Sequence, residues 1–119
     1  MKGPFVLLVL ICLAFLLACN RMKFNKEKWN GVSDIGFPTI YRKQMLHDLV
    51  TNHKWLGLTY KELINYLGSA DAVESNAVYY KIIVDYGSDI DPVYTKDLVF
   101  TLSIDSVVQK VQIVEWSDK

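Results

Sequence analysis

The sequence predicts an α+β fold for residues 37–119, with two N-terminal helices packed on a three-stranded antiparallel sheet. Two observations carry this prediction. Before Gly68 the apolar residues recur at helical spacing, and after it they alternate with polar residues, as in strands. Both helical stretches also precede all of the strand-like ones, an order that is typical of α+β domains.

The first helix is predicted over residues 41–53. Its apolar residues recur at the spacing of one helical face. They are Tyr41, Met45, Leu49 and Val50, with Leu46 beside them. Four polar residues lie largely off that stripe, namely Arg42, Lys43, Gln44 and Asp48. The apolar stripe is therefore expected to face the sheet.

The second helix, over residues 60–67, has chemical signals at both ends. Thr59 and Glu62 form a capping box, in which the hydroxyl accepts from a backbone N–H and the carboxylate reaches back to the cap. The apolar stripe consists of Leu63, Ile64 and Leu67. Gly68 stands where a residue with positive φ commonly ends a helix, so a positive φ is predicted there.

Three strands are predicted over residues 77–86, 98–105 and 107–116, which are rich in Val, Ile and Tyr. The apolar face is expected to carry Val78, Tyr80, Ile82, Val84 and Tyr86, then Leu98, Phe100, Leu102 and Ile104, then Val107, Val111 and Ile113. Asp105 and Ser106 predict a tight hairpin without the usual glycine. One sheet face should carry both helices, and the other should be partly exposed.

The first 18 residues are typical of a lipoprotein signal peptide. The apolar run over residues 5–17 is shorter than the roughly 20 residues that span a bilayer, and it suits the core of a signal peptide. Leu16, Leu17, Ala18 and Cys19 then resemble the lipobox read by lipoprotein signal peptidase. Cys19 is therefore the predicted lipidation site. A short membrane anchor or a buried N-terminal helix is the alternative.

Residues 19–36 are predicted to form a lipidated flexible tether, because they lack a sustained apolar period. Trp29 either docks on the domain or rests at the membrane interface. Residues 19–43 carry six basic and two acidic side chains, a net charge of +4, whereas Gln44 onward carries six and eleven, a net charge of −5. The basic stretch either leans on anionic headgroups or is simply solvated. Nucleic acid is not an expected partner, because of the export signal and the acidic body.

No set of residues predicts catalysis, a metal site or a cofactor. His47 and His53 are six apart and do not share a helix face, and neither cysteine nor a third histidine joins them. Asp85, Asp89, Asp91 and Asp97 lack the spacing of a calcium loop. Ser33 and Ser69 have no marked histidine or aspartate partner. We therefore expect no enzyme activity and no small-molecule substrate.

The candidate binding residues are Tyr79 and Trp116, on the sheet side of the domain. Aromatic side chains are enriched where proteins meet. A three-stranded sheet also has two edges unless something covers them. The alternative is that these aromatics pack against the tether around Trp29.

Residues 56–68, Leu-Gly-Leu-Thr-Tyr-Lys-Glu-Leu-Ile-Asn-Tyr-Leu-Gly, resemble a pattern of small outer-membrane lipoproteins of the SmpA/OmlA (BamE-like) group. The likeness covers roughly residues 45–116. It departs at Ala70, where the group often has proline, and at Ser106, which replaces a hairpin glycine. It implies a two-helix, three-strand domain without an active site, a fold shared with β-lactamase-inhibitor proteins. In the best-known members that domain supports assembly of outer-membrane β-barrels.

The sequence thus predicts a non-catalytic binding or scaffold module of the bacterial cell envelope. Its predicted partners are the membrane, through lipid on Cys19, and an unidentified envelope protein. The alternative is an inhibitor or immunity-type protein that blocks a secreted enzyme. Asn20 stands in place of the aspartate that retains lipoproteins at the inner membrane in enterobacteria, which favours the outer membrane.

Overall fold

A computed structural model of the chain describes residues 21–31 and 38–118. The predicted signal peptide and Cys19 lie outside the described residues. The helices within that part are α2 (Lys26–Asn30), α3 (Ile40–Asn52) and α4 (Tyr60–Leu67). The strands are β1 (Ala72–Glu74), β2 (Ala77–Asp85), β3 (Tyr94–Leu102) and β4 (Val108–Ser117).

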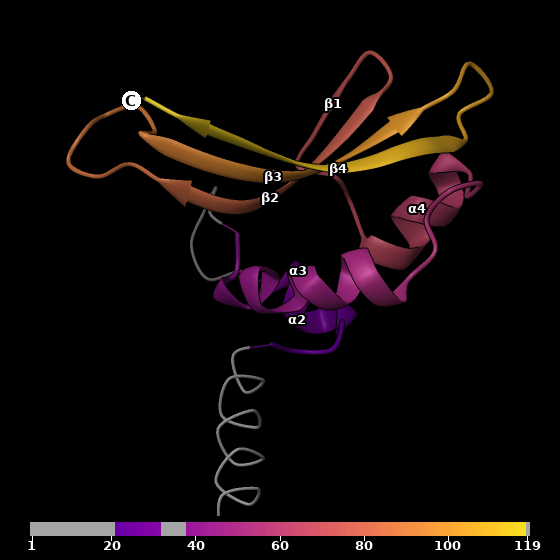
Figure 1. Cartoon of the computed structure of the whole chain (residues 1–119), viewed down its shortest axis with the longest axis horizontal. Helices are drawn as coiled ribbons and strands as arrows, with labels where there is room; N and C mark the ends of the chain where they lie inside the picture. Colours follow the sequence, from indigo (N-terminus) through magenta and orange to yellow (C-terminus); the bar gives the residue numbers. More distant parts are fainter. Residues whose placement is uncertain (1–20, 32–37, 119) are drawn as a thin grey trace, which may run out of the picture.

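The four strands form one antiparallel sheet in the order β1-β2-β3-β4, and the helices lie on one of its faces (Figure 1). The predicted α+β class and the one-sided helical layer are therefore confirmed. The predicted numbers of two helices and three strands are wrong, because the described residues add α2 and β1. β1 has only three residues, all exposed, which is too short to show an apolar alternation.

Helix α3 forms where it was predicted, but it buries a different stripe. Its buried side chains are Arg42, Met45, Leu46 and Leu49, which have the i, i+3, i+4, i+7 spacing of one face. Tyr41 and Val50 are exposed, so their prediction as core residues is wrong. A polar side chain, Arg42, occupies the position on the stripe that the sequence pattern assigned to its apolar neighbour.

Helix α4 agrees with its predicted caps. The Thr59 hydroxyl accepts from the Glu62 N–H, and the Glu62 carboxylate accepts from the Thr59 N–H. Gly68 has a φ of 96°, which confirms the predicted positive φ. A side chain at Gly68 would also collide with the Asn30 carboxamide, which lies against it. Glycine is thus required there for two separate reasons.

Two irregularities change which strand residues face the helices. A bulge in β2 falls between Lys81 and Ile83, so Ile82 and Ile83 both face the helical layer and Val84 turns away. The placement of Val84 on the buried face is therefore wrong, and Tyr86 lies beyond the end of β2. In β4 a similar shift buries Val108 in place of the predicted Val107.

The hairpin between β3 and β4 forms without glycine, as predicted. Ser106 adopts a φ of 61°, and its N–H donates to the Ser103 carbonyl. β3 ends at Leu102, however, so Ile104 lies in the loop and is fully exposed. The prediction that Ile104 belongs to the buried face is wrong, because the alternation continues past the end of the strand.

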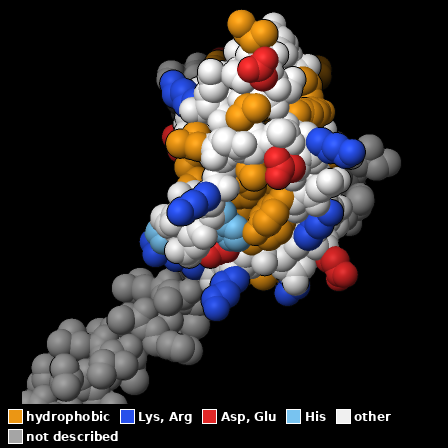
Figure 2. All heavy atoms as spheres, turned by 90° about the vertical axis from the view of Figure 1, so that its right-hand side faces the viewer, with side chains coloured by type: hydrophobic (Ala, Val, Ile, Leu, Met, Phe, Trp, Pro, Cys, Tyr) orange, Lys and Arg blue, Asp and Glu red, His pale blue; other side chains and the backbone are white. Residues whose placement is uncertain are grey.

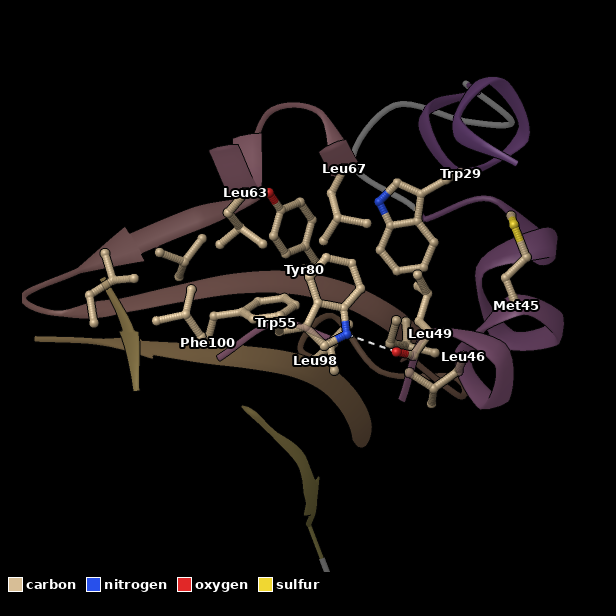
Figure 3. Close-up of a cluster of buried hydrophobic side chains, with 14 residues drawn as sticks. Trp29, Met45, Leu46, Leu49, Trp55, Leu63, Leu67, Tyr80, Leu98 and Phe100 are labelled. Atoms are coloured by element: carbon tan, nitrogen blue, oxygen red, sulfur yellow. Dashed lines mark hydrogen bonds between the residues drawn. The ribbon is translucent and has the colours of Figure 1, made fainter. Parts of the chain in front are cut away.

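The core lies between the sheet and the helices, and aromatic rings fill its centre (Figure 3). Trp55 packs edge-on against Phe100, and Phe100 packs edge-on against Tyr80. The Trp55 indole N–H donates to the Leu49 carbonyl at 2.7 Å, so this polar atom is satisfied inside the core.

The segment before α3 belongs to the domain. Trp29 of α2 is completely buried, beside the Tyr80 ring. The Met22 N–H donates to the Gln44 carbonyl, and the Asn25 side chain caps α2. The prediction of a flexible tether over residues 19–36 is therefore wrong for residues 21–31. A single tryptophan has no period, so its burial could not be recognised from the pattern of apolar residues.

Arg42 joins this segment to the sheet. Its Nε donates to the Trp29 carbonyl, and its Nη1 donates to Asp71 at 2.6 Å and to the Lys81 carbonyl at 2.9 Å. The guanidinium also lies 4.6 Å from the centre of the Trp29 ring. Arg42 is therefore buried with its charge paired and with hydrogen-bond partners on three other segments.

Substitutions of Trp29 test whether this residue docks in the core or belongs to a flexible tether. Trp29→Ala should reduce the free energy of unfolding by about 3–5 kcal/mol, because a large buried side chain is lost. Trp29→Phe should cost clearly less, because the ring is retained and the buried indole N–H, which has no hydrogen-bond partner among the described residues, is removed. Urea unfolding of the three proteins measures both differences. An alanine variant as stable as the parent would contradict the docking.

Candidate functional site

The predicted binding residues lie on the same face of the sheet, but they do not form one patch. Tyr79 is paired with Val99 of β3, and Val99 is paired with Gln112 of β4. Trp116 lies four residues beyond Gln112, so it is separated from Tyr79 both across and along the strands. Both side chains are on the face opposite the helices.

The surroundings of these two aromatics differ. Tyr79 is half-buried, and neighbouring Val99 is almost fully buried although no described helix covers that face. Burial there also raises the pKa of Asp97, the residue two before Val99. Trp116 is 49% exposed near the end of β4, beside the segment 89–93. Trp29 lies on the other side of the sheet, so the alternative that these aromatics pack against it is wrong for the described part of the segment, residues 21–31.

The long edge of the sheet is β4. At its start the loop from Gly57 to Thr59 covers it, since Gly57 donates to the Val108 carbonyl and the Val108 N–H donates to Leu58. From Lys110 to Trp116 no described strand pairs with the outer side of β4. Unpaired strand edges bind other strands readily, and natural proteins usually protect them.

A groove runs between this edge and the C-terminal end of α3. It has a volume of about 720 Å³ and is lined by Val50, His53, Lys54, Trp55 and Leu56 on one side and by residues 109–113 on the other. Leu56 and Ile113 remain 66% and 42% exposed. Figure 2 shows hydrophobic side chains exposed on the end of the molecule where α4 meets the sheet. The groove between β4 and the end of α3, lined by residues 50, 53–56 and 109–113, is called the β4 groove.

A relay of polar side chains borders the β4 groove. The Tyr66 hydroxyl lies 2.7 Å from His53 Nδ1, and His53 Nε2 lies 3.0 Å from the Asp48 carboxylate. The His53 ring stacks on Trp55 and meets Tyr66 edge-on. Sequence reasoning missed this relay, because His53 lies five residues after Asp48 and thirteen before Tyr66, a spacing without a recognisable motif.

This relay fastens the N-terminal segment. Asp48 also accepts from the Phe24 N–H at 2.8 Å and from Asn52, and the Phe24 ring stacks on Tyr66. The hydrogen bonds from Asn52 and Phe24, with His53 adding to them, lower the pKa of Asp48 to about 2. The relay atoms therefore already bond to each other or to Phe24, and the arrangement supports a structural role better than nucleophilic catalysis.

The two histidines do not form a common site, and Ser33 lies outside the described residues. His47 lies near Arg21, away from His53 and its relay. Within residues 21–31 and 38–118, no group of three His, Cys, Asp or Glu side chains is placed to hold a metal ion. No helix in that part of the chain is long and apolar enough to cross a membrane.

Comparison of the chain with protein-family models, with characterised proteins and with solved structures finds no match in any of the three.

We expect Asp48→Asn to remove an acid-sensitive part of the stability. Folding lowers the Asp48 pKa from 3.8 to about 2, so the folded state favours the carboxylate. This contribution is complete above the unfolded pKa and is lost as the pH falls toward about 2. As the pH is lowered from about 6 to about 2, a range that spans both pKa values, the melting temperature should therefore fall less steeply in the variant than in the parent. An unchanged slope would show that Asp48 does not act in this way.

Proposed function

We propose that this chain is a membrane-anchored bacterial lipoprotein whose domain acts as a non-catalytic binding module in the cell envelope. The observation that carries the binding role is the open edge of β4 together with the apolar β4 groove beside it. The anchoring role is supported by the sequence, in which an apolar run ends at the lipobox-like residues before Cys19.

The binding role follows from what the β4 groove leaves unsatisfied. The free side of a strand presents backbone N–H and C=O groups that another extended chain can pair with. The adjoining side chains of Leu56 and Ile113 are apolar and exposed, so an incoming chain would also bury hydrophobic surface. The favoured partner is therefore a protein with an extended segment in which apolar residues alternate with polar ones.

The resemblance to the SmpA/OmlA (BamE-like) group points the same proposal toward outer-membrane assembly. The capping box and the glycine that ends α4 are the residues that carry this likeness. A partner that is itself a β-sheet protein would suit an open strand edge.

We expect Cys19 to be the mature N-terminus and to carry lipid. The full-length gene product, extracted from membranes and digested, should yield an N-terminal peptide that starts at Cys19 and has the added mass of acyl chains. Cys19→Ser should abolish both the cleavage and the added mass. An unmodified Cys19 in the parent, or a retained leader, would refute the anchoring role.

We expect charge in the β4 groove to abolish partner capture. Ile113→Lys and Leu56→Lys each place a cation in the apolar groove, at positions exposed enough to leave the fold intact. Recovery of the bound partner from mild-detergent membrane extracts should fall about tenfold or more, the equivalent of about 1.4 kcal/mol. Cross-linking from residues 110–116 should report the contact itself.

The matched control is Ile104→Lys, the same substitution at a fully exposed isoleucine on the hairpin loop, which should leave recovery unchanged. Tyr79→Ala and Trp116→Ala test the opposite sheet face in the same assay. If the groove variants recover the partner as well as the parent does while these aromatics do not, binding lies on that face. A single secreted enzyme as partner would favour the inhibitor or immunity-type class over an envelope scaffold.

A further inference from the structure

The two layers of the domain carry opposite charge. The helical part, residues 21–31 and 38–67, contains eight Lys or Arg and three Asp or Glu, a net charge of +5. The sheet part, residues 68–118, contains three Lys and nine Asp or Glu, a net charge of −6. The domain is therefore an electrical dipole whose axis runs from the helices to the sheet, although the whole chain is formally neutral.

The positive charges of the helical layer are available to a partner. Arg42 is buried with Asp71, but the other seven basic side chains are exposed. Among the described residues none of these seven forms an ion pair with a carboxylate. Five of them belong to the N-terminal segment and the start of α3, and we call these five the basic face: Arg21, Lys23, Lys26, Lys28 and Lys43. In Figure 2, Lys and Arg side chains gather mainly over the lower, helical half of the molecule.

The basic face also carries exposed apolar surface. Ile40 is 69% exposed at the start of α3, and Tyr41 beside it is partly exposed. The Lys28 ammonium lies 5.2 Å from the centre of the Tyr41 ring. Basic side chains interspersed with aliphatic and aromatic ones are typical of surfaces that rest on anionic membranes.

The chain enters the domain at this face. Met22 is bonded to Gln44 of α3, and the Arg21 guanidinium lies 3.3 Å from His47 of the same helix. Cys19 precedes Arg21 by two residues, which span at most about 7 Å when extended. If Cys19 carries lipid, as the proposed function holds, the basic face is within about one Debye length of the headgroups.

We propose that the basic face binds the surface of an anionic phospholipid bilayer and thereby fixes the orientation of the domain. The helical layer rests on the headgroups, and the acidic sheet is repelled from them. The β4 groove, at the border of the two layers, and the outer sheet face then stay accessible from the aqueous side. This inference rests on the proposed lipid anchor, which brings the basic face close to the membrane, and on the charge of the two layers, which decides how the domain is oriented there.

The test is amine footprinting of the full-length lipidated protein in vesicles. One vesicle type is phosphatidylcholine alone, and the other contains about 30 mol % phosphatidylglycerol. Acylation of Lys23, Lys28 and Lys43, quantified by mass spectrometry, should fall about fivefold in the anionic vesicles. Labelling of Lys96 and Lys110 on the sheet should stay the same. In about 1 M salt, where the Debye length is about 3 Å, the protection should disappear.

A pair of double variants shows whether the location of the charge matters. Lys23→Glu with Lys28→Glu should abolish the protection of Lys43. Lys54→Glu with Lys61→Glu makes the same change in net charge at the other end of the helical layer and should leave that protection in place. Protection that survives the first double variant would overturn the assignment of the basic face.

The same digest separates this inference from the proposed anchor. The mass of the peptide that begins at Cys19 reports lipidation independently of lysine labelling. A lipidated Cys19 with equal labelling of the basic face in both vesicle types overturns the membrane-bound orientation and leaves the anchor standing. An unmodified Cys19 with protection in anionic vesicles overturns the anchor and supports the basic face. Equal protection of the sheet lysines also contradicts the proposed orientation.

Discussion

The arrangement of this domain depends on the buried guanidinium of Arg42. Three segments that are distant in the sequence supply its partners: the Trp29 carbonyl in α2, the Asp71 carboxylate before β1 and the Lys81 carbonyl at the β2 bulge. Removing one partner from a fully buried ion pair commonly costs about 3–5 kcal/mol, and the cost is lower where one partner is partly solvated. The Asp71 side chain is 29% exposed, so the two backbone carbonyls contribute a large share of what Arg42 stabilises. Lysine could not replace Arg42, because the planar fork addresses several acceptors at once.

The elements whose ends are defined by local chemistry were predicted well, and those defined by distant contacts were not. Helix α4 has a capping box and a glycine stop within ten residues, so its bounds follow from the sequence alone. Helix α3 has no side-chain cap, and its buried face is decided by Arg42 and by partners as distant as Lys81. The β2 bulge is another tertiary effect: nothing in a run of Ile and Val indicates where one residue will be left unpaired. The sequence left open whether Trp29 docks on the domain or rests at the membrane interface, because its place in the core depends on Tyr80 and Arg42.

The candidate site was predictable only in part. The placement of Tyr79 and Trp116 on the face away from the helices follows from the alternation of side chains along the strands. That a sheet of few strands has edges open to other chains also follows from the sequence. The β4 groove does not, because its two sides come from the end of α3 and from β4, which are about half of the chain apart. The relay through His53 could not be predicted either, because Tyr66 is thirteen residues away in the sequence and reaches His53 only in the folded domain. The separation of charge, in contrast, was predictable from the sequence. The helices come before the strands in the chain, so the basic start of the sequence lies in the helical layer and most of the acidic residues lie in the sheet.

The docking of α2 has a consequence for the order in which the protein takes shape. The Trp29 ring packs beside Tyr80, and the Trp29 carbonyl accepts from Arg42, which also donates to Lys81, so α2 can be secured only after the middle of the sheet has formed. Contacts between residues so far apart close late, since a long loop must be ordered first. If the chain is exported and cleaved as proposed, residues 21–31 would therefore still be undocked while the nearby cleavage site is processed. Once β2 is in place, Trp29 and α2 can dock, so docking of this segment would follow such processing in time.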